Sequence, residues 1–433
     1  MGLLIGVGAT QPTFPYDQYY GIEYDVTVSN PDSLTRIGKM ELHKSLPCQS
    51  GMRRCLLNDD GTVNYYLGDT DSTKRDTGSA ANLTGADGMV MVEMPDMYVR
   101  FEHDGNKRRT LFSIYALPGF TKWSKIYGSA YEASLNRTNN KLSSVVNVTA
   151  DYRGGVNNAS WDGTYRSLLG MPATNISLTT FRTYARNRGA NWNCNTYEFQ
   201  KRAYWMFVVE YATLNSQKAF NAELNSEGYH QGGLGSGVTE LSDWGNYNSY
   251  NPIVPCGVTN SLGNKTGVVT YNVMKSDGAT VHYAAPVPSY RGIENPFGHI
   301  WKITDGVKFM IQSEADGGKS LIYVCDNPAN YSSSGVTGYE LRGELPRSEG
   351  YVKTICHGEH GDILPTAVGA GSTSYFCDYF YTSIPESGTA ERACFFGGCA
   401  YSGAAAGFVS AISNDSASFA DASCGSRLCF MPS

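Results

Sequence analysis

Charged residues are scarce in this chain of 433 residues. Lys and Arg number 34 and Asp and Glu 40, so 17% of the residues are charged and the net charge is −6. An average soluble domain carries about 25%. Basic and acidic residues are mixed along the sequence, which argues against a protein that coats nucleic acid, because such a protein presents a basic patch. A hydrophobic content of 41% argues equally against a disordered chain.

Signals for membrane insertion and for familiar enzyme classes are also missing. No apolar run reaches the ~18 residues of a membrane-spanning helix. The apolar start MGLLIGVG lacks the basic region and the length of a secretion signal. The sequence contains no GxSxG elbow, no P-loop and no HExxH motif. We therefore expect no membrane insertion and no enzyme, and we assign no catalytic residue.

Cysteine and candidate metal ligands show no recognised spacing. The eleven cysteines are odd in number, so at least one is unpaired within the chain, and no CxxC pair indicates a zinc ribbon. The sequences NDDG and GDTD are typical of solvated turns, and no DxDxD-type loop supplies the oxygens that calcium needs. His357 and His360 form a lone pair in HGEH. We expect no metal site and no cofactor, with a structural calcium ion as the open alternative.

Glycine and tyrosine are abundant, at 48 and 30 residues. With low charge, this composition suits a rigid, loop-rich protein that contains β-strands and works outside the cytosol. Residues 1–110 predict a small, mostly β N-terminal domain for attachment or trimerisation. In it YYGIEYDVTVSN has strand character, and GMVMVEMPDMYVRFEHDG suggests two strands paired around a Pro turn.

Residues 111–433 predict a second domain of mixed α and β structure. We expect short helices at 127–137 and 179–188. The clearest helix spans 197–222, which contains no Gly or Pro and places Tyr204, Val208 and Tyr211 on one face. After residue 225, GVKFMIQSE, KSLIYVCD and AGFVSAIS read as strands between long loops. The fold class that this order predicts is α+β.

Three motifs in a fixed order give the second domain a resemblance. WMFVVEYATLNSQ resembles the "EWEYA" helix of the formylglycine-generating-enzyme family, NPFGHIWKITDGV its "GNVWEWxxD" segment, and GSRLCF its closing "GFR". The residues that carry the resemblance are Glu210, Tyr211, Gly298, Trp301, Asp305, Gly425 and Arg427. The resemblance implies a C-type-lectin-like fold, with long loops around small sheets. We expect Tyr211 and Trp301 to be core packing residues.

The stretch 393–424 resembles the variable region of diversity-generating retroelement target proteins. In that family AAC codons are randomised to NNC, which cannot encode Lys, Glu, Gln, Met or Trp, and residues 393–424 contain none of these five. The stretch has two charged residues, and both fall on positions that align with diversified sites. These positions are Cys399, Tyr401, Ser402, Ala405, Asn414, Asp415, Phe419, Asp421 and Ser423. They are interleaved with residues that look like framework, among them Gly397, Gly398, Gly403 and Gly407.

Segments such as YYGIEYDV, ALPGF and FRTYARNRG resemble proteins of phages and prophages of gut bacteria. Taken together, the resemblances imply a phage tail- or head-fibre receptor-binding protein, carried in the virion as a homotrimer. Its partners would be a host surface receptor, glycan or protein, and other virion proteins, but not nucleic acid. One alternative is a bacterial surface lectin or pilus-tip adhesin, which would be extracellular or on the cell surface.

A remote alternative is a formylglycine-generating oxidase. That family binds copper with two cysteines that have four residues between them, a spacing shared by Cys394 with Cys399 and by Cys424 with Cys429. In that family the cysteine pair follows a pair of glycines, whereas Cys394 and Cys399 lie on either side of Gly397 and Gly398. Cys399 also lies on a position that aligns with a diversified site. We therefore expect buried thiols here, or a local disulfide. Assembly in a reducing cytosol predicts buried thiols for most of the other cysteines as well.

Overall fold

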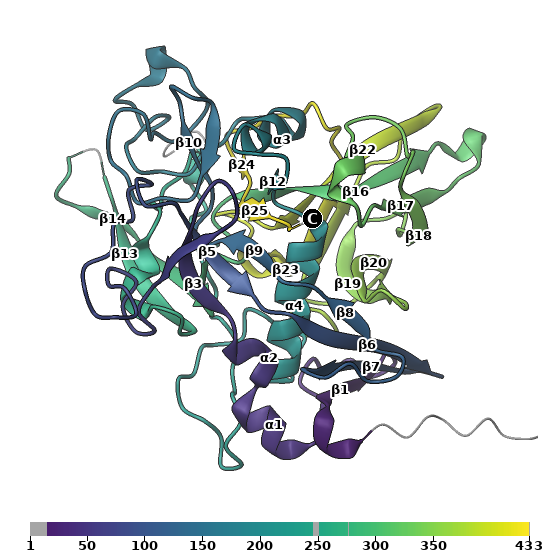
Figure 1. Ribbon diagram of the computed structural model, residues 1–433. Coiled ribbons are helices and arrows are strands. Elements are labelled where there is room, and N and C mark those ends of the chain that lie inside the picture. The colour runs from purple at the N-terminus through teal and green to yellow at the C-terminus, as the bar shows by residue number, and fades with distance from the viewer. Residues whose placement is uncertain (1–14, 246–250, 276, 433) are drawn as a thin grey trace, which may run out of the picture.

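The computed structural model describes residues 15–245, 251–275 and 277–432. Residues 1–14, which contain the apolar start, lie outside this range. The fold is rich in β-structure, with 36% of residues in strands and 14% in helices. Figure 1 shows the long helix α4 (Tyr197–Tyr211) in the middle of the molecule, with sheets on either side.

Five strands from the first third of the chain form one antiparallel sheet, in the order β2-β1-β7-β6-β8. Their bounds are β1 (Tyr20–Asp25), β2 (Thr35–Gly38), β6 (Met97–Asp104), β7 (Lys107–Ser113) and β8 (Thr121–Trp123). A six-stranded sheet has the order β12-β25-β9-β5-β3-β4. Its strands are β3 (Arg53–Leu57), β4 (Val63–Tyr66), β5 (Met89–Met94), β9 (Ile126–Ser129), β12 (Trp192–Cys194) and β25 (Leu428–Phe430).

The six-stranded sheet changes two expectations about the N-terminal region. Strands β5 and β9 pair with each other although they lie on opposite sides of residue 110, so no break between sheets falls at the boundary expected there. The two strands expected around Pro95 both exist, but they do not pair: β5 and β6 belong to different sheets. Strand patterns in the sequence show where strands form, whereas the pairing partner is decided by tertiary packing.

The nine-stranded sheet dominates the second half of the chain, with the path β18-β17-β16-β22-β23-β21-β19-β20 and with β24 pairing in parallel with β16. Its strands are β16 (Trp301–Gln312), β17 (Ser320–Val324), β18 (Glu340–Glu344), β19 (Gly350–His357), β20 (Asp362–Val368), β21 (Tyr379–Thr382), β22 (Thr389–Gly397), β23 (Gly407–Ser413) and β24 (Cys424–Gly425). Two small sheets complete the strands: β10 (Ser134–Asn136) with β11 (Lys141–Ser143), and β13 (Gly267–Met274) with β14 (Val281–Tyr290) and β15 (Ile293–Glu294).

Three other α-helices, whose full extent lies within the described residues, are short: α1 (Met40–Ser45), α2 (Pro47–Ser50) and α3 (Leu178–Arg186). Single 3₁₀ turns lie at Tyr16–Gln18, Ala159–Trp161, Val258–Leu262, Glu314–Asp316, Pro328–Asn330 and Gly403–Ala405. Helix α3 confirms the helix predicted at 179–188. The helix predicted at 127–137 is wrong, because this segment contributes β9 between β5 and β25 and then β10.

Helix α4 begins where the sequence predicts and ends eleven residues earlier. The Thr196 side chain caps its first turn by accepting from the backbone N–H of Phe199. The helix stops at Tyr211 because Ala212 adopts a left-handed conformation, with φ of 51°, and its N–H bonds to the carbonyl of Val208. Fourteen of its residues are buried, which is the pattern of a helix surrounded by protein on all sides.

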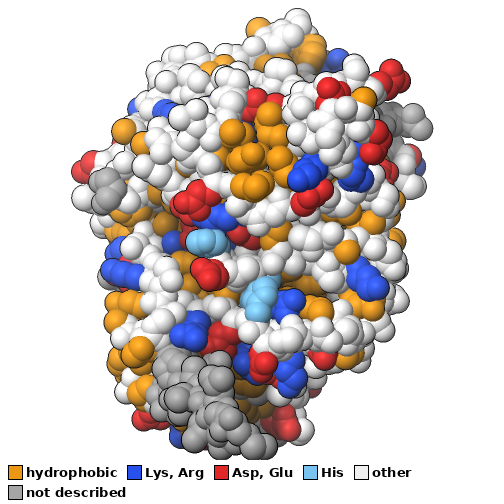
Figure 2. All heavy atoms as spheres, turned by 90° about the vertical axis from the view of Figure 1, so that its right-hand side faces the viewer, with side chains coloured by type: hydrophobic (Ala, Val, Ile, Leu, Met, Phe, Trp, Pro, Cys, Tyr) orange, Lys and Arg blue, Asp and Glu red, His pale blue; other side chains and the backbone are white. Residues whose placement is uncertain are grey.

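The surface reflects the low charge of the sequence. On the face drawn in Figure 2, acidic and basic side chains are scattered among uncharged polar groups, and the most prominent group of hydrophobic side chains lies in the upper half, with smaller groups elsewhere. No helix in the described residues is long and apolar enough to span a bilayer.

Candidate functional site

The motif residues on α4 and β16 are held in buried ion pairs. The carboxylate of Glu210, which is 1% exposed, accepts from Nε and Nη2 of Arg291 at 2.6 and 2.8 Å and from the Tyr290 hydroxyl at 3.0 Å. The carboxylate of Asp305, also 1% exposed, accepts from Nε and Nη2 of Arg182 at 2.5 and 3.0 Å. Two-pronged contacts of this kind fix geometry, so both carboxylates act as framework.

The motif residues near Gly298 and Arg427 lie where the C-terminal segment packs against β16, because β24 pairs with the start of that strand. Trp301 is 5% exposed and contacts the ring of Tyr381 edge to face at 6.0 Å, which confirms the prediction of a core residue. Its neighbour Gly298 has φ of 74°, and Gly425 pairs with β16. The Arg427 guanidinium is buried and donates to the carbonyl oxygens of Ser129, Glu294 and Asn295.

A buried charge cluster lies next to these motifs. Glu132 accepts from His299 Nδ1 at 2.5 Å and pairs with Lys302 Nζ at 2.8 Å, and the side chains of all three are at most 2% exposed. Burial alone would raise the pKa of Glu132, but the charge of Lys302 and the hydrogen bond from His299 Nδ1 outweigh it and hold this pKa at about 2. Burial lowers the pKa of Lys302 to about 8, against the attraction of Glu132.

Sequence reasoning missed this cluster. His299 and Lys302 stand inside NPFGHIWKITDGV, where a charged residue beside a core Trp is a usable signal. Glu132 lies in no motif, and 167 positions of sequence separate it from His299.

The nine positions predicted to be variable differ in exposure. Tyr401 is 50% exposed, whereas Cys399 is 1% exposed and packs in the core, so Cys399 is not placed to contact a ligand. The remaining positions are partly exposed: Ser402, Ala405, Asn414, Asp415, Phe419, Asp421 and Ser423. They lie in two segments, 399–405 between β22 and β23 and 414–423 between β23 and β24.

Main-chain hydrogen bonds hold both segments to the frame. In the first, the Ala400 N–H donates to the carbonyl of His299 at 2.9 Å, and the Gly403 N–H donates to the carbonyl of Thr239 at 2.8 Å. In the second, three carbonyl groups at predicted variable positions accept from framework N–H groups. These bonds are Ala393 to Asp415 at 2.8 Å, Asn175 to Asp421 at 2.9 Å and Trp301 to Ser423 at 2.9 Å. Such bonds survive a change of side chain.

A few side chains in these segments do stabilise the loops locally. The Ser402 hydroxyl accepts from the Cys399 N–H at 2.9 Å, and Asp421 Oδ1 accepts from the Ser423 N–H at 2.7 Å. Phe419 contacts the Phe395 ring edge to face at 5.9 Å. Tyr401 packs beside Trp244 at 6.0 Å between ring centroids. Asp415 has a pKa raised by partial burial, with Arg392 opposing the shift.

Aromatic residues of β21 and β19 adjoin the second segment and were not predicted. Tyr379 lies 4.6 Å from Tyr381 and 5.1 Å from Tyr351 between ring centroids, and all three are partly exposed. Tyr381 is in register with Ile412 of β23, two residues before Asn414. The codon argument could not find them because they precede residue 393, but the alternation in YFYT is a usable strand signal.

The cysteines are thiols. All eleven are free and ten are buried, which confirms the expectation of buried thiols. Cys394 and Cys399 are 0% and 1% exposed, and burial raises the pKa of both. Copper binds the thiolate form, so this environment disfavours a copper pair.

Most positions weighed as metal ligands hydrogen bond to other protein groups. Asp60 accepts from the Thr62 N–H at 2.9 Å, and His357 hydrogen bonds to His103 at 3.0 Å. Within the described ranges, no group of three His, Cys, Asp or Glu residues is arranged to hold a metal ion. The sequence matches no protein-family model and no curated protein.

Proposed function

We propose that the protein is a phage tail- or head-fibre receptor-binding protein with a C-type-lectin-like domain. In this proposal it acts in the virion as a homotrimer, contacts other virion proteins, and binds the host surface through the segments 399–405 and 414–423. The observation that carries the proposal is that main-chain bonds fix both segments while eight of the nine candidate residues are at least partly exposed.

This arrangement supports ligand recognition by exchangeable side chains. A rigid frame that positions loops lets binding residues vary without loss of folding. Tyr401 offers aromatic area at low entropic cost, and Asn414, Asp415 and Ser402 offer polar contacts, which is the chemistry of antibody paratopes. Several copies on one particle would strengthen a weak single contact through avidity.

The state and burial of the cysteines argue against the two alternative functions, the adhesin and the oxidase. Disulfides form and persist in the oxidising environment of a secreted adhesin, whereas eleven thiols suit assembly in a reducing cytosol. An oxidase needs accessible thiolates, but Cys394 and Cys399 are buried with raised pKa values. Both considerations favour the receptor-binding proposal.

A binding experiment tests the proposal at the protein level. Tyr401→Ala and Asp415→Ala should weaken binding to host cells, measured by flow cytometry with labelled protein, or change which strains are bound. Tyr115→Ala is the matched control, because Tyr115 is 51% exposed and follows β7 in another sheet. If the Tyr401 and Asp415 variants bind every strain as well as the control does, the assigned face is wrong.

The gene locus gives a second test. A reverse transcriptase gene and a near-copy of codons 393–430 that differs only at adenines should lie beside the gene. Neighbouring pilus genes, with no template copy and no phage genes, would instead favour the adhesin.

A further inference from the structure

A cavity of about 840 Å³ lies at the end of the molecule that contains α1. One wall is formed by residues 32–44, which include β2 and most of α1, and the other by residues 211–232, which begin at the last residue of α4. Figure 1 places α1 at the opposite end of the molecule from β24, which follows the segment 414–423. The segment 399–405 lies nearer, because Gln217 in the second wall donates from Nε2 to the carbonyl of Gly403 at 3.0 Å. The size of the cavity falls in the usual range for small-molecule sites, about 300–1,000 Å³.

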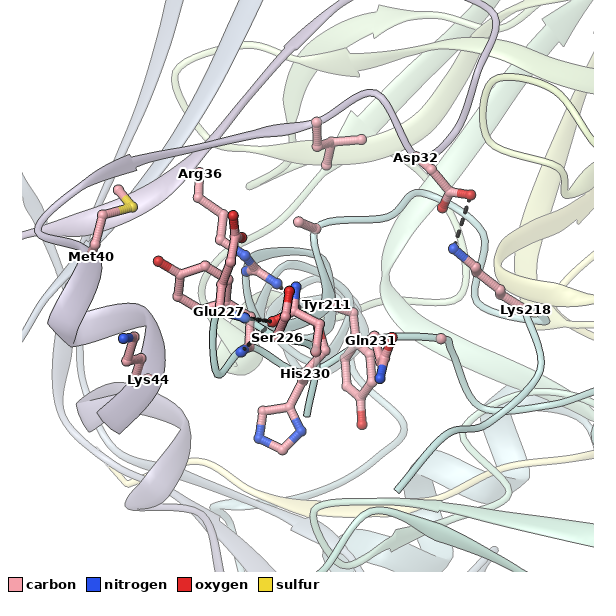
Figure 3. A pocket seen from close by; sticks show the side chains of 15 residues that line it. Asp32, Arg36, Met40, Lys44, Tyr211, Lys218, Ser226, Glu227, His230 and Gln231 are labelled. Atoms are coloured by element: carbon pink, nitrogen blue, oxygen red, sulfur yellow. Dashed lines mark hydrogen bonds and ion pairs between the residues drawn. The ribbon is translucent and has the colours of Figure 1, made fainter. Parts of the chain in front are cut away.

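Arg36 brings a positive charge to this cavity, where the carboxylates of Glu210 and Glu227 attract it without forming an ion pair. Its Nη1 donates to the carbonyls of Val209 and Glu210 at 3.1 and 3.0 Å, and its Nη2 donates to the carbonyl of His230 at 3.2 Å. A guanidinium has five donors, so two remain for a ligand. No carboxylate among the described residues is within ion-pair distance of Arg36. Figure 3 shows its side chain reaching in among the lining residues.

The other lining charges leave a small positive excess. Lys218 is paired with Asp32 at 3.0 Å, as Figure 3 shows. Lys44 has no ion-pair partner in the described part of the chain and lies 5.9 Å from the centre of the Tyr229 ring. Glu227 is the remaining acid. Three cations against two anions give +1 for the lining, in a protein whose net charge is −6.

The rest of the lining is aromatic and polar. Tyr229 lies under the Arg36 guanidinium at 4.7 Å, and the rings of Tyr211 and His230 are 5.6 Å apart. Ser226 and Gln231 add hydroxyl and amide groups. A mixture of ring faces and uncharged hydrogen-bonding groups suits a hydroxylated ring.

We propose that this cavity binds a sugar that bears one carboxylate or phosphate group. The anion lies against the free donors of Arg36 and the ammonium of Lys44, and the sugar ring lies against the aromatic wall. The cavity is lined by none of the nine candidate variable residues, and this inference does not rest on the receptor-binding proposal.

Calorimetric titration of the whole chain with four probes tests the proposal. N-acetylneuraminic acid carries a carboxylate, glucose 6-phosphate carries a phosphate, glucose is neutral, and inorganic phosphate lacks the sugar. We expect one or both acidic sugars to bind at millimolar concentration, more weakly as salt is added, and more tightly than glucose or inorganic phosphate. Which acidic sugar binds identifies the acid group.

Variants locate the site. Lys44→Gln should weaken binding of the acidic sugar roughly fivefold. Lys39→Gln is the matched control, because Lys39 precedes the same helix and pairs with Glu41 outside the cavity. Arg36→Lys keeps the charge but loses the guanidinium fork, and should weaken binding roughly tenfold; circular dichroism checks that it folds.

Four results would overturn the proposal. They are no binding of either acidic sugar, equal binding of glucose, equal binding of inorganic phosphate, or equal losses in the Lys44 and Lys39 variants.

Discussion

Replacing Glu132 by Gln should destabilise the protein, because it removes the carboxylate that neutralises Lys302 in the core. Both side chains are almost fully buried, with Lys302 at 0% and Glu132 at 2% exposure. Removing one partner of a buried ion pair costs about 3–5 kcal/mol, since the other charge is left without compensation. Unfolding entropy of about 0.9 kcal/mol/K for a chain of this length converts this loss into a fall in Tm of roughly 3–6 °C.

The pH dependence gives the same prediction an independent signature. The pKa of Glu132 is about 2 in the folded protein, against an ordinary value of 4.5. The unfolded chain therefore takes up this proton first as the pH falls. The stabilisation is present above about pH 4.5 and is lost between about pH 4.5 and 2. The Glu132→Gln variant lacks this contribution, so its difference from the unaltered protein should shrink as the pH falls through that window.

Urea unfolding followed by tryptophan fluorescence measures both effects. Asp32→Asn is the control, because it breaks the exposed pair with Lys218 and should cost under about 1 kcal/mol. The double variant Glu132→Gln with Lys302→Met should recover most of the loss, since it removes the stranded charge. An unchanged midpoint for Glu132→Gln, or no recovery in the double variant, would refute the assignment of a buried ion pair.

Three further predictions concern the core. Trp301→Ala should lower the free energy of unfolding by about 3–5 kcal/mol, whereas the partly exposed Trp161→Ala should cost much less; similar urea midpoints would contradict the core assignment. A thiol-reactive dye should titrate eleven thiols in denaturant and mainly Cys356 in the native protein, and finding five disulfides would overturn this. Burial lowers the pKa of His357 to about 3, so stability should fall as the pH drops from about 6.5 toward 3. His357→Gln should show a shallower fall, and an equally steep one would contradict the burial argument.

The helices show which parts of the secondary structure local sequence can predict. The start of α4 was predictable, because Thr196 precedes a long run without Gly or Pro. The end of α4 was not predictable from local sequence. The carbonyls of Val209 and Glu210 in its last turn accept from Arg36, which lies 173 and 174 positions earlier in the chain. The segment expected as a helix at 127–137 forms strands because partners on both sides, β5 and β25, pair with it, and tertiary pairing overrides local propensity.

The candidate site was predictable where one continuous stretch supplies it. The resemblance of residues 393–424 to a variable region selected nine positions, of which eight are at least partly exposed and one, Cys399, is buried; their role in binding stays a prediction. The adjoining Tyr379 and Tyr381 come from another strand, and Glu132 reaches His299 across 167 positions. Contacts between residues so far apart in sequence depend on the fold, so no local sequence pattern predicts them.

Two glycines that flank the segment 399–405 cannot be replaced by larger residues, whereas exposed side chains within the segment can change. Gly398 has φ of 79°, and a Cβ there would lie 2.6 Å from the Cβ of Ala406, so a side chain would force the loop apart. A Cβ on Gly407 would lie 1.9 Å from Oδ1 of the buried Asp378. Neither limit applies to Tyr401, whose ring is half exposed. Close backbone approach at the two glycines, together with main-chain bonds at Asp415 and Ser423, therefore lets composition change at the surface while the path of the chain stays fixed.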